Sequence, residues 1–259
     1  MPKEPSAQYS SSSFSCRDVL IKPLSVDRFL VVGCDSSGAV GSKPGDSIRV
    51  DGEVLGKFIV RTALMEVLAV GAKPLCVACG LGVESEPSGN HILEGVKMEM
   101  RKVGLDPRSD LVVSTEKNFQ TNQTGIGVAV VGIAHKRKLR IGKSKQGDNV
   151  VCIGLPSVGL EVLENEREGV IADLDDLLRL LSLDFVHGII PVGSRGILKE
   201  VEVLAMESKL HVMLCENPPV NLNKSAGPST VLIATIRKNH FEELKTLFKK
   251  PVCKIATLV

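Results

Sequence analysis

The chain is predicted to have an α/β (α+β) fold, in which sheets and helices pack in layers. Short runs of β-branched residues alternate with longer apolar or amphipathic runs through both halves of the sequence. Hydrophobic residues make up 43% of the 259 residues, which is enough to bury a sizeable core. Charged residues make up only 24%, and this balance is not typical of a disordered chain.

The first half shows four predicted strands and two predicted helices. Gly71 and Gly104 stand where C-terminal helix caps are expected. The polar stretch 35–46, DSSGAVGSKPGD, is expected to form a loop. Residues 1–15 are polar and rich in serine, and we expect a flexible tail there. Strands are predicted over residues 28–34, 75–81, 111–114 and 126–134, and helices over 55–70 and 90–103.

The second half repeats this mixture of elements. It follows the basic run 135–140, HKRKLR, which we interpret as a solvated turn at a domain boundary. The predicted domains are therefore residues 16–138 and 139–259. Strands are predicted over residues 149–154, 185–190, 211–215 and 230–236, and helices over 160–166, 174–181, 196–208 and 240–248.

Composition excludes several classes of function. The 32 Lys and Arg against 30 Asp and Glu give a net charge of +2, so the chain lacks the basic field of a nucleic-acid binder. It also lacks an apolar run of about 18 residues and an apolar signal core, so we expect no membrane partner. Seven irregularly spaced Cys indicate reduced thiols in a cytoplasmic protein. Cys76 and Cys79 are interpreted as buried strand cysteines and not as a zinc site.

Four carboxylates stand in unusual places. Asp35 follows an apolar strand and opens a Gly/Ser stretch, so it either holds a metal ion or organises a turn. Glu66 lies in an apolar helix, where a carboxylate needs a metal, a proton or an ion pair with Arg61 or Lys57. Glu116 ends another apolar strand.

Asp18, the fourth acid, precedes the apolar run Val19-Leu20-Ile21. If the four acids converge, a hard cation such as Mg²⁺ is the ion that suits an all-oxygen ligand set. The common nucleotide-binding and nucleophile motifs are missing, because the sequence contains no G-x-x-x-x-G-K-[ST], G-x-G-x-x-G or G-x-S-x-G.

Several segments together resemble the aminoimidazole ribonucleotide synthetase-like superfamily. Asp35-Ser-Ser-Gly-Ala-Val-Gly-Ser-Lys43 is similar to its D-G-V-G-T-K segment. Leu64-Met-Glu-Val-Leu-Ala-Val-Gly-Ala-Lys-Pro74 is similar to the N-D-L-x-x-x-G-A-x-P helix shared with thiamine-monophosphate kinase. Ser114-Thr-Glu116 stands where those proteins carry G-G-E-T or G-G-D-T. Pro191-Val-Gly-Ser-Arg-Gly-Ile-Leu198 is similar to an S-D-G-L or T-R-G-G-L segment, and Gly227-Pro-Ser-Thr230 stands in the place of a G-E-D-Y-type segment.

The resemblance covers about residues 16 to 257 and implies a two-domain fold with a dimerising N-terminal sheet and a C-terminal α/β sandwich. It implies ATP and Mg²⁺ as cofactors and a homodimer as the assembly. Within the superfamily the chain most resembles α-ribazole kinase, which phosphorylates the nucleoside of the lower cobamide ligand. The implied acceptor is therefore a small nucleoside.

The resemblance also implies roles for individual residues. Metal ligands would be Asp18, Asp35, Glu66 and Glu116, with Asp35 and Glu116 also in catalytic roles. Nucleotide contacts would come from Ser36, Ser37, Gly38, Lys43, Thr115, Asn118, Gln123 and Thr124.

The sequence departs from the pattern of thiamine-monophosphate kinase at four places. Glu66 and Glu116 replace Asp, Arg17-Asp18 replaces a paired acid, and Arg195 replaces the acid of S-D-G-L. Three further functions therefore stay open beside the α-ribazole kinase. The first is a kinase like thiamine-monophosphate kinase, the second is another ATP-dependent synthetase of the superfamily, and the third is a nucleotide-binding protein without catalysis.

Overall fold

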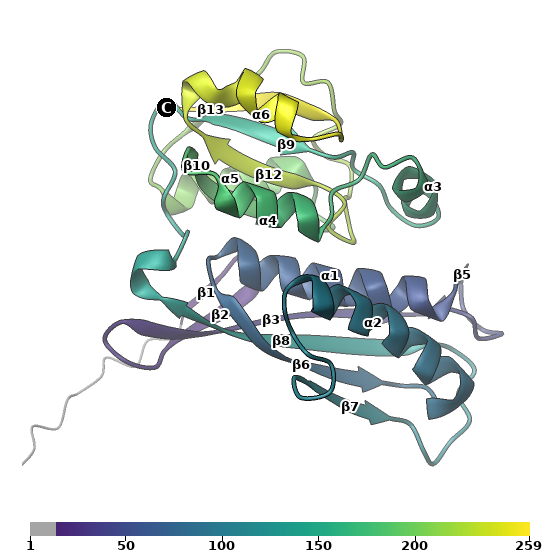
Figure 1. Cartoon of the computed structure of the whole chain (residues 1–259). Helices are drawn as coiled ribbons and strands as arrows, with labels where there is room; N and C mark the ends of the chain where they lie inside the picture. The colour runs from purple at the N-terminus through teal and green to yellow at the C-terminus, as the bar shows by residue number, and fades with distance from the viewer. Residues whose placement is uncertain (1–13) are drawn as a thin grey trace, which may run out of the picture.

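The structure, a computed structural model, describes residues 14–259 and is built around two larger sheets with helices between and around them (Figure 1). Residues 1–13 lie outside the described residues, so the predicted tail over 1–15 is described only where β1 begins, at Phe14. The mixed sheets and helices confirm the predicted α/β (α+β) fold class.

The N-terminal sheet has six strands in the order β1-β2-β3-β8-β6-β7. Neighbouring strands run antiparallel, except that β6 and β7 are parallel. The strands are β1 (Phe14–Cys16), β2 (Val19–Pro23), β3 (Arg28–Gly38), β6 (Lys73–Leu81), β7 (Leu111–Thr115) and β8 (Gly125–His135). A separate parallel pair, β4 (Val40–Gly41) and β5 (Ile48–Arg49), follows β3.

Two helices, α1 (Gly52–Ala69) and α2 (Asn90–Lys102), pack side by side next to this sheet (Figure 1). The side chain of Asp51 caps α1 by accepting a hydrogen bond from the Glu53 N–H at 2.9 Å. Glycines let the helices approach closely, since a Cβ on Gly56 would lie 1.9 Å from the Ile92 carbonyl oxygen. A Cβ on Gly95 would likewise lie 1.9 Å from the Glu53 carbonyl oxygen. Both positions therefore require glycine.

The opposite face of the N-terminal sheet is not covered by any described helix (Figure 1). Three apolar side chains from β2, β6 and β7 are exposed there, namely Leu20, Leu75 and Val112. A run of exposed apolar side chains on one face of a sheet is typical of an interaction surface.

The C-terminal sheet has five antiparallel strands in the order β10-β12-β9-β13-β11. The hydrophobic side chains of α5 pack with Val150 and Cys152, whereas those of α4 pack with Val151 and Ile153, so the two helices cover opposite faces. The strands are β9 (Asn149–Ile153), β10 (Val186–Pro191), β11 (Val212–Leu214), β12 (Leu232–Ile236) and β13 (Val252–Leu258). The helices are α3 (Glu161–Arg167), α4 (Leu174–Ser182), α5 (Ile197–Glu207) and α6 (Phe241–Leu247), and the short turns are η1 (Ser85–Gly89), η2 (Lys136–Lys138) and η3 (Lys238–His240).

Helix α1 lies between the N-terminal sheet and the C-terminal half of the molecule (Figure 1). Its buried residues Val60 and Leu64 belong to the same hydrophobic cluster as Leu177 of α4 and Ile189 of β10. One continuous core therefore joins both halves, and few positions on α1 contact water. No helix within residues 14–259 combines the length and the apolar character that crossing a membrane requires.

Every predicted strand and helix has a counterpart in the structure, but two features differ from the prediction. Strand β3 continues through the segment predicted as a loop as far as Gly38, because its backbone pairs with β8 up to the partners Gly38 and Gly125. Strands β1, β2 and β13 and the short pair of β4 and β5 were not predicted. The boundary between residues 138 and 139 stays a prediction, although it falls directly after η2 and before β9.

Candidate functional site

Asp35 lies on the face of β3 that meets α1. Alternate residues of this strand point toward the helix, and a Cβ on Gly33 would lie 3.0 Å from Val67. The Asp35 Oδ1 atom accepts a hydrogen bond from the Ser36 N–H at 2.8 Å. Burial raises the pKa of the Asp35 carboxyl, and the nearby charge of Asp18 raises it further. Asp35 is thus a half-buried carboxylate and not only a turn residue.

Glu66 lies on α1 and is almost fully buried, with 4% of its surface exposed. Its Oε2 atom has no hydrogen-bond partner among the described residues. Burial raises the pKa of Glu66 to about 8, and the charges of Asp18, Glu200 and Asp35 act in the same direction. A buried, unpartnered carboxylate is costly unless a proton or a cation accompanies it.

The ion pairs considered for Glu66 from the sequence are wrong, because both candidate cations bind other acids. The Arg61 guanidinium contacts Glu99, with 3.0 Å between Nε and Oε2. The Lys57 ammonium contacts Glu166, with 2.7 Å between Nζ and Oε1. Glu66 therefore receives no charge compensation from its own helix.

Asp18 lies in the turn between β1 and β2 and is more than half exposed. Its Oδ1 atom is 3.8 Å from Nη2 of Arg195, which belongs to the loop before α5. Asp18 lies close enough to influence the pKa of both Asp35 and Glu66. The structure therefore brings three of the four predicted metal ligands into one neighbourhood.

Glu116, the fourth, lies elsewhere. Its Oε1 atom accepts hydrogen bonds from the N–H groups of Asn118 at 2.7 Å and Phe119 at 3.2 Å, which lower its pKa. It directly follows β7, a strand that is separated from β3 by β8 and β6, a distance of about 14 Å at the usual strand spacing. Within residues 14–259, no group of three His, Cys, Asp or Glu side chains is arranged to hold one metal ion. The four predicted ligands thus do not converge on one point.

Three of the predicted nucleotide contacts, Lys43, Thr115 and Asn118, lie near Glu116. Lys43 donates a hydrogen bond to Glu84, which lowers the pKa of that carboxyl to about 2. Lys43, Glu116 and Asn118 line an open polar hollow of about 710 Å³ that also includes the turn η1. The Thr115 hydroxyl lies 2.9 Å from that of Ser85, in the same turn.

The side chains of Gln123 and Thr124 form hydrogen bonds that hold the loop carrying Lys43. Gln123 Nε2 donates to the Gly45 carbonyl oxygen at 2.7 Å. Thr124 is buried, and its N–H and hydroxyl both donate to Asp46, each at 2.7 Å. These contacts give both residues a structural role in holding the loop.

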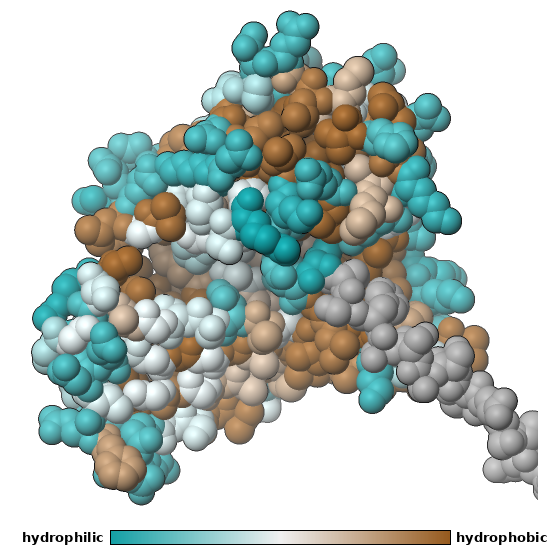
Figure 2. All heavy atoms as spheres, turned by 180° about the vertical axis from the view of Figure 1, so that it is seen from behind, coloured by the Kyte–Doolittle hydropathy of each residue, from teal (hydrophilic) through white to brown (hydrophobic). Residues whose placement is uncertain are grey.

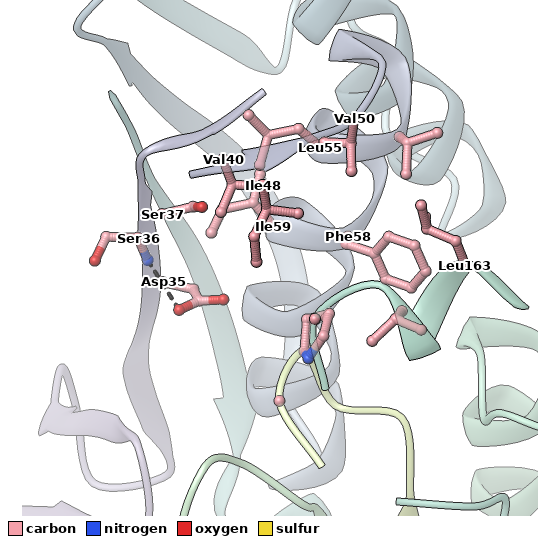
Figure 3. A pocket seen from close by; sticks show the side chains of 15 residues that line it. Asp35, Ser36, Ser37, Val40, Ile48, Val50, Leu55, Phe58, Ile59 and Leu163 are labelled. Carbon is pink, nitrogen blue, oxygen red and sulfur yellow. Dashed lines mark hydrogen bonds between the residues drawn. The ribbon is translucent and has the colours of Figure 1, made fainter. Parts of the chain in front are cut away.

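A second cavity, of about 300 Å³, lies between the two halves of the chain (Figure 3). Asp35, Ser36 and Ser37 form its polar end, and Figure 3 shows Phe58 and Leu163 on the opposite side. Gly38 is not part of its lining. The apolar walls come from Val40, Ile48, Val50, Val54, Leu55, Phe58, Ile59, Val162 and Leu163, and the backbone of Gly159, Gly227 and Pro228 completes them. Asp35 is the charged residue of this apolar pocket.

Sequence reasoning missed Glu200 of α5, which is 3% exposed. A signal for its burial was present, since Ile197, Glu200, Val201 and Leu204 follow the spacing of one helix face. It missed the apolar pocket for a different reason, because the lining residues come from segments far apart in the sequence.

No protein-family model matches this sequence, and a comparison with curated proteins finds no match. Solved structures do match. Thiamine-monophosphate kinase from Stenotrophomonas maltophilia K279a is similar with a TM-score of 0.64 and 16% identity, over 94% of this chain and 86% of that chain. The hydrogenase maturation protein HypE from E. coli gives a TM-score of 0.60 and 17% identity, over 88% and 79%.

A third structure, T. maritima PurL in complex with ADP, gives a TM-score of 0.63 and 16% identity, over 96% of this chain and 43% of that chain. At these identities the similarity establishes the fold. The chain has the two-domain aminoimidazole ribonucleotide synthetase-like fold. The expectation drawn from the sequence segments is confirmed at the level of fold.

Proposed function

We propose that this protein is an ATP- and Mg²⁺-dependent kinase that phosphorylates a hydroxyl group of a small nucleoside, with α-ribazole as the first candidate. The observation that carries the proposal is the apolar pocket with Asp35 at its polar end. Its aliphatic and aromatic walls suit an uncharged ring system, because they offer no compensating charge to an ionic group. A ribose hydroxyl would then face Asp35.

The residues around Glu66 fit a magnesium ion. Glu66 has an unpartnered, buried oxygen atom, and Asp18 and Asp35 add carboxylate oxygens nearby. Oxygen ligands are those that Mg²⁺ prefers, and the ion usually takes one or two carboxylates together with substrate phosphates. When bound, Mg²⁺ supplies positive charge that neutralises the phosphate oxygens during transfer.

The protein's own residues would position the reactants. Asp35 would orient the acceptor hydroxyl and take up its proton, a role helped by its raised pKa. Lys43 would contact the nucleotide phosphates after leaving Glu84. Phosphoryl transfer depends mainly on such positioning and charge neutralisation.

Thiamine monophosphate is at least as well supported as an acceptor by the fold comparison, since thiamine-monophosphate kinases are among the similar structures. Two further candidates are a synthetase of the same fold and a protein that binds nucleotides without catalysis. The candidates differ in their products. A kinase yields ADP and a phosphate ester in equal amounts, a synthetase releases inorganic phosphate, and an inactive binder yields neither product.

The proposal is tested by incubating the protein with Mg²⁺-ATP and either α-ribazole or thiamine monophosphate, and by measuring ADP, inorganic phosphate and ester. We expect the ester of α-ribazole, and we expect Asp35→Asn to abolish it. Asp184→Asn, at an exposed position before β10, is the matched control and should keep full activity. Esterification of thiamine monophosphate alone would contradict the choice of acceptor, and ATP turnover without any ester would contradict the kinase reaction.

We also propose that two copies associate through the uncovered face of the N-terminal sheet. The exposed side chains Leu20, Leu75 and Val112 support this surface. Val112→Lys should convert a dimer to a monomer in light scattering. The control, Met206→Lys, changes an exposed apolar residue at the far end of α5. A monomeric wild-type protein would contradict the proposal.

A further inference from the structure

We propose that Cys152 and Cys253 form an oxidation site, at which hydrogen peroxide joins the two thiols in a reversible disulfide bond. The two residues face each other on β9 and β13, which are neighbouring strands of the C-terminal sheet. This site lies in a different part of the molecule from the candidate carboxylates and does not line the apolar pocket. It does not depend on the proposed kinase function.

The strand register places the two cysteines directly opposite each other. In the antiparallel pair of β9 and β13, Cys253 is the Cα partner of Cys152, and the next pair is Val252 with Ile153. Cα atoms of opposite residues in such a pair lie about 4.5 to 5.5 Å apart. Disulfide bonds join residues whose Cα atoms are about 4.4 to 6.8 Å apart. The bond therefore requires no slip of one strand along the other.

Both cysteine side chains lie on the face of the sheet that α5 covers. Opposite residues of two paired strands point to the same side of a sheet, and successive residues alternate between its sides. Cys253 packs against the hydrophobic cluster that contains Cys152 and Val201 of α5, whereas Val252 packs against the cluster on the other face. The two thiols are thus neighbours within one cluster.

The two thiols differ in their exposure and in their acidity. Both are free, but Cys152 is fully buried and Cys253 is half-buried at the margin of the cluster. The adjacent Cys152 thiol lowers the pKa of Cys253, while contact with Cys253 and burial raise the pKa of Cys152. Thiolates are the form of cysteine that peroxide oxidises, so Cys253 reacts first.

Cys215 provides a comparison within the same sheet. It follows β11, on the side of β13 that faces away from β9, and its N–H donates to the Ile255 carbonyl oxygen at 2.9 Å. Cys215 is half-buried, as Cys253 is. Its backbone contact is with Ile255, two residues beyond Cys253, so it is similar in exposure without being aligned for a disulfide bond.

The reaction has two steps. The Cys253 thiolate attacks one oxygen atom of hydrogen peroxide, so that an S–O bond forms, the O–O bond breaks and hydroxide leaves. The Cys152 sulfur then attacks the sulfur of the resulting sulfenic acid, so that the S–S bond forms and the S–O bond breaks. The released hydroxide takes the proton of the Cys152 thiol. In total, two thiols are oxidised and one peroxide is reduced to two molecules of water.

The test is to treat the full-length protein with hydrogen peroxide and to map linked peptides by mass spectrometry without a reductant. We expect a peptide pair that joins Cys152 to Cys253. Non-reducing electrophoresis should show that the bond lies within one chain, and dithiothreitol should restore both thiols because thiol–disulfide exchange is reversible.

Variants distinguish this disulfide from separate oxidation of each cysteine. Cys152→Ala keeps the core apolar and removes the second thiol, so the sulfenic acid of Cys253 should persist, and its capture by dimedone should rise about tenfold or more over the wild type. Cys253→Ser changes only a half-buried residue, and it should leave Cys152 as a free thiol. Cys215→Ser is the matched control and should form the same linkage as the wild type.

Four results would overturn the inference. One is resistance of both thiols to peroxide, and another is conversion of Cys253 to sulfinic acid while Cys152 stays a free thiol. The third is a linkage of Cys253 to Cys215. The fourth is equal capture of Cys253 by dimedone in the wild type and in Cys152→Ala. All four are read from the cysteines themselves and require no measurement of kinase activity.

Discussion

Arg17 and Glu207 form a buried, two-point ion pair that joins the start of the N-terminal sheet to the end of α5. The guanidinium Nε lies 3.0 Å from Oε1 of Glu207, and Nη2 lies 2.8 Å from Oε2. Arg17 also has a φ of 54°, in the left-handed region, so the ion pair holds a strained turn residue in place. Because Asp18 is the next residue, this contact fixes the candidate cation site relative to the C-terminal half.

Glu207→Gln should therefore destabilise the fold. The variant leaves the Arg17 guanidinium buried without its counter-charge, and we expect a loss of about 3 kcal/mol in the free energy of unfolding, measured with urea. Glu202→Gln breaks an exposed pair with Lys199 and should cost less than about 0.5 kcal/mol. Equal effects from the two variants would contradict the importance of the buried pair.

The raised pKa of Glu66 predicts a dependence of stability on pH in metal-free buffer. The folded state keeps the Glu66 proton up to a pKa of about 8, whereas the unfolded chain releases it near the ordinary value of 4.5. The folded state thus binds more protons between these values, so this contribution is complete below about pH 4.5 and declines up to about pH 8. At most about 5 kcal/mol of stability is lost over this range.

Urea unfolding at several pH values checks this prediction. Glu66→Gln cannot titrate and should show a flatter profile than the wild type, while Glu202→Gln should show the wild-type slope. Saturating Mg²⁺ should remove the decline in the wild type, because a bound cation stabilises the ionised carboxylate. A wild-type slope in Glu66→Gln would show that another group is responsible.

The buried pair of Arg61 and Glu99 is expected to respond differently to single and double changes. Both side chains are almost completely buried, and Glu99 also contacts Lys102 at 2.8 Å. Glu99→Gln alone should cost about 3 kcal/mol, because it leaves Arg61 in the core without a full counter-charge. The double variant Arg61→Met with Glu99→Leu should recover most of this stability in a thermodynamic cycle. Additive losses would contradict the ion-pair explanation.

The apolar pocket should determine the affinity for the acceptor. Leu163 lines it from the C-terminal half, and Leu163→Ala removes apolar contact there. We expect KM for the acceptor to rise about tenfold while KM for ATP stays unchanged. Leu160→Ala, at an exposed position of the same segment that does not line the pocket, is the matched control. A change in KM for ATP alone would assign the pocket to the nucleotide.

The exposed surface seen from behind is consistent with an opening between the halves. Figure 2 shows hydrophobic residues on either side of a hollow at the left of the molecule. Val158 is an exposed large hydrophobic residue in the segment next to the pocket. It would meet an acceptor that enters this way.

Glu84 controls the availability of Lys43. Glu84→Gln removes the negative charge that holds Lys43, so we expect KM for ATP to fall several-fold if Lys43 contacts phosphate. Glu86→Gln, in the same turn η1, should have no effect, because Glu86 contacts Asn90 and not Lys43. Unchanged KM for ATP in both variants would exclude Lys43 from the phosphate site.

The helices and most strands could be predicted because their signals are local. The apolar run that ends near Gly71 predicted α1, and the alternation of residues 126–134 predicted β8. The extension of β3 through Asp35 was not predictable in this way, since serine and glycine have little intrinsic preference for strands. Hydrogen bonds to β8, a strand much later in the chain, hold that segment extended.

The candidate site was predictable only in part. Burial of Glu66 followed from its apolar neighbours along the helix, which is a property of the sequence. The sequence did not predict that Glu116 and Asp35 lie far apart. Each residue stands at an apolar strand, and the order of these strands in the sheet cannot be deduced from the sequence. The resemblance also implied nucleotide contacts for Gln123 and Thr124, although their side chains hold the loop near Asp46 and Gly45.

By itself, the sequence determined the layered α/β fold and the presence of acids in apolar surroundings, because periodicity and composition act over a few residues. Only the tertiary structure decided which acids meet. Chain topology brings Asp18 of the turn between β1 and β2 to Arg195 of the loop before α5, and it carries Glu116 to the end of β7, three strands away from Asp35. Electrostatic interaction depends on distance through space and on burial, and neither quantity is encoded in spacing along the chain.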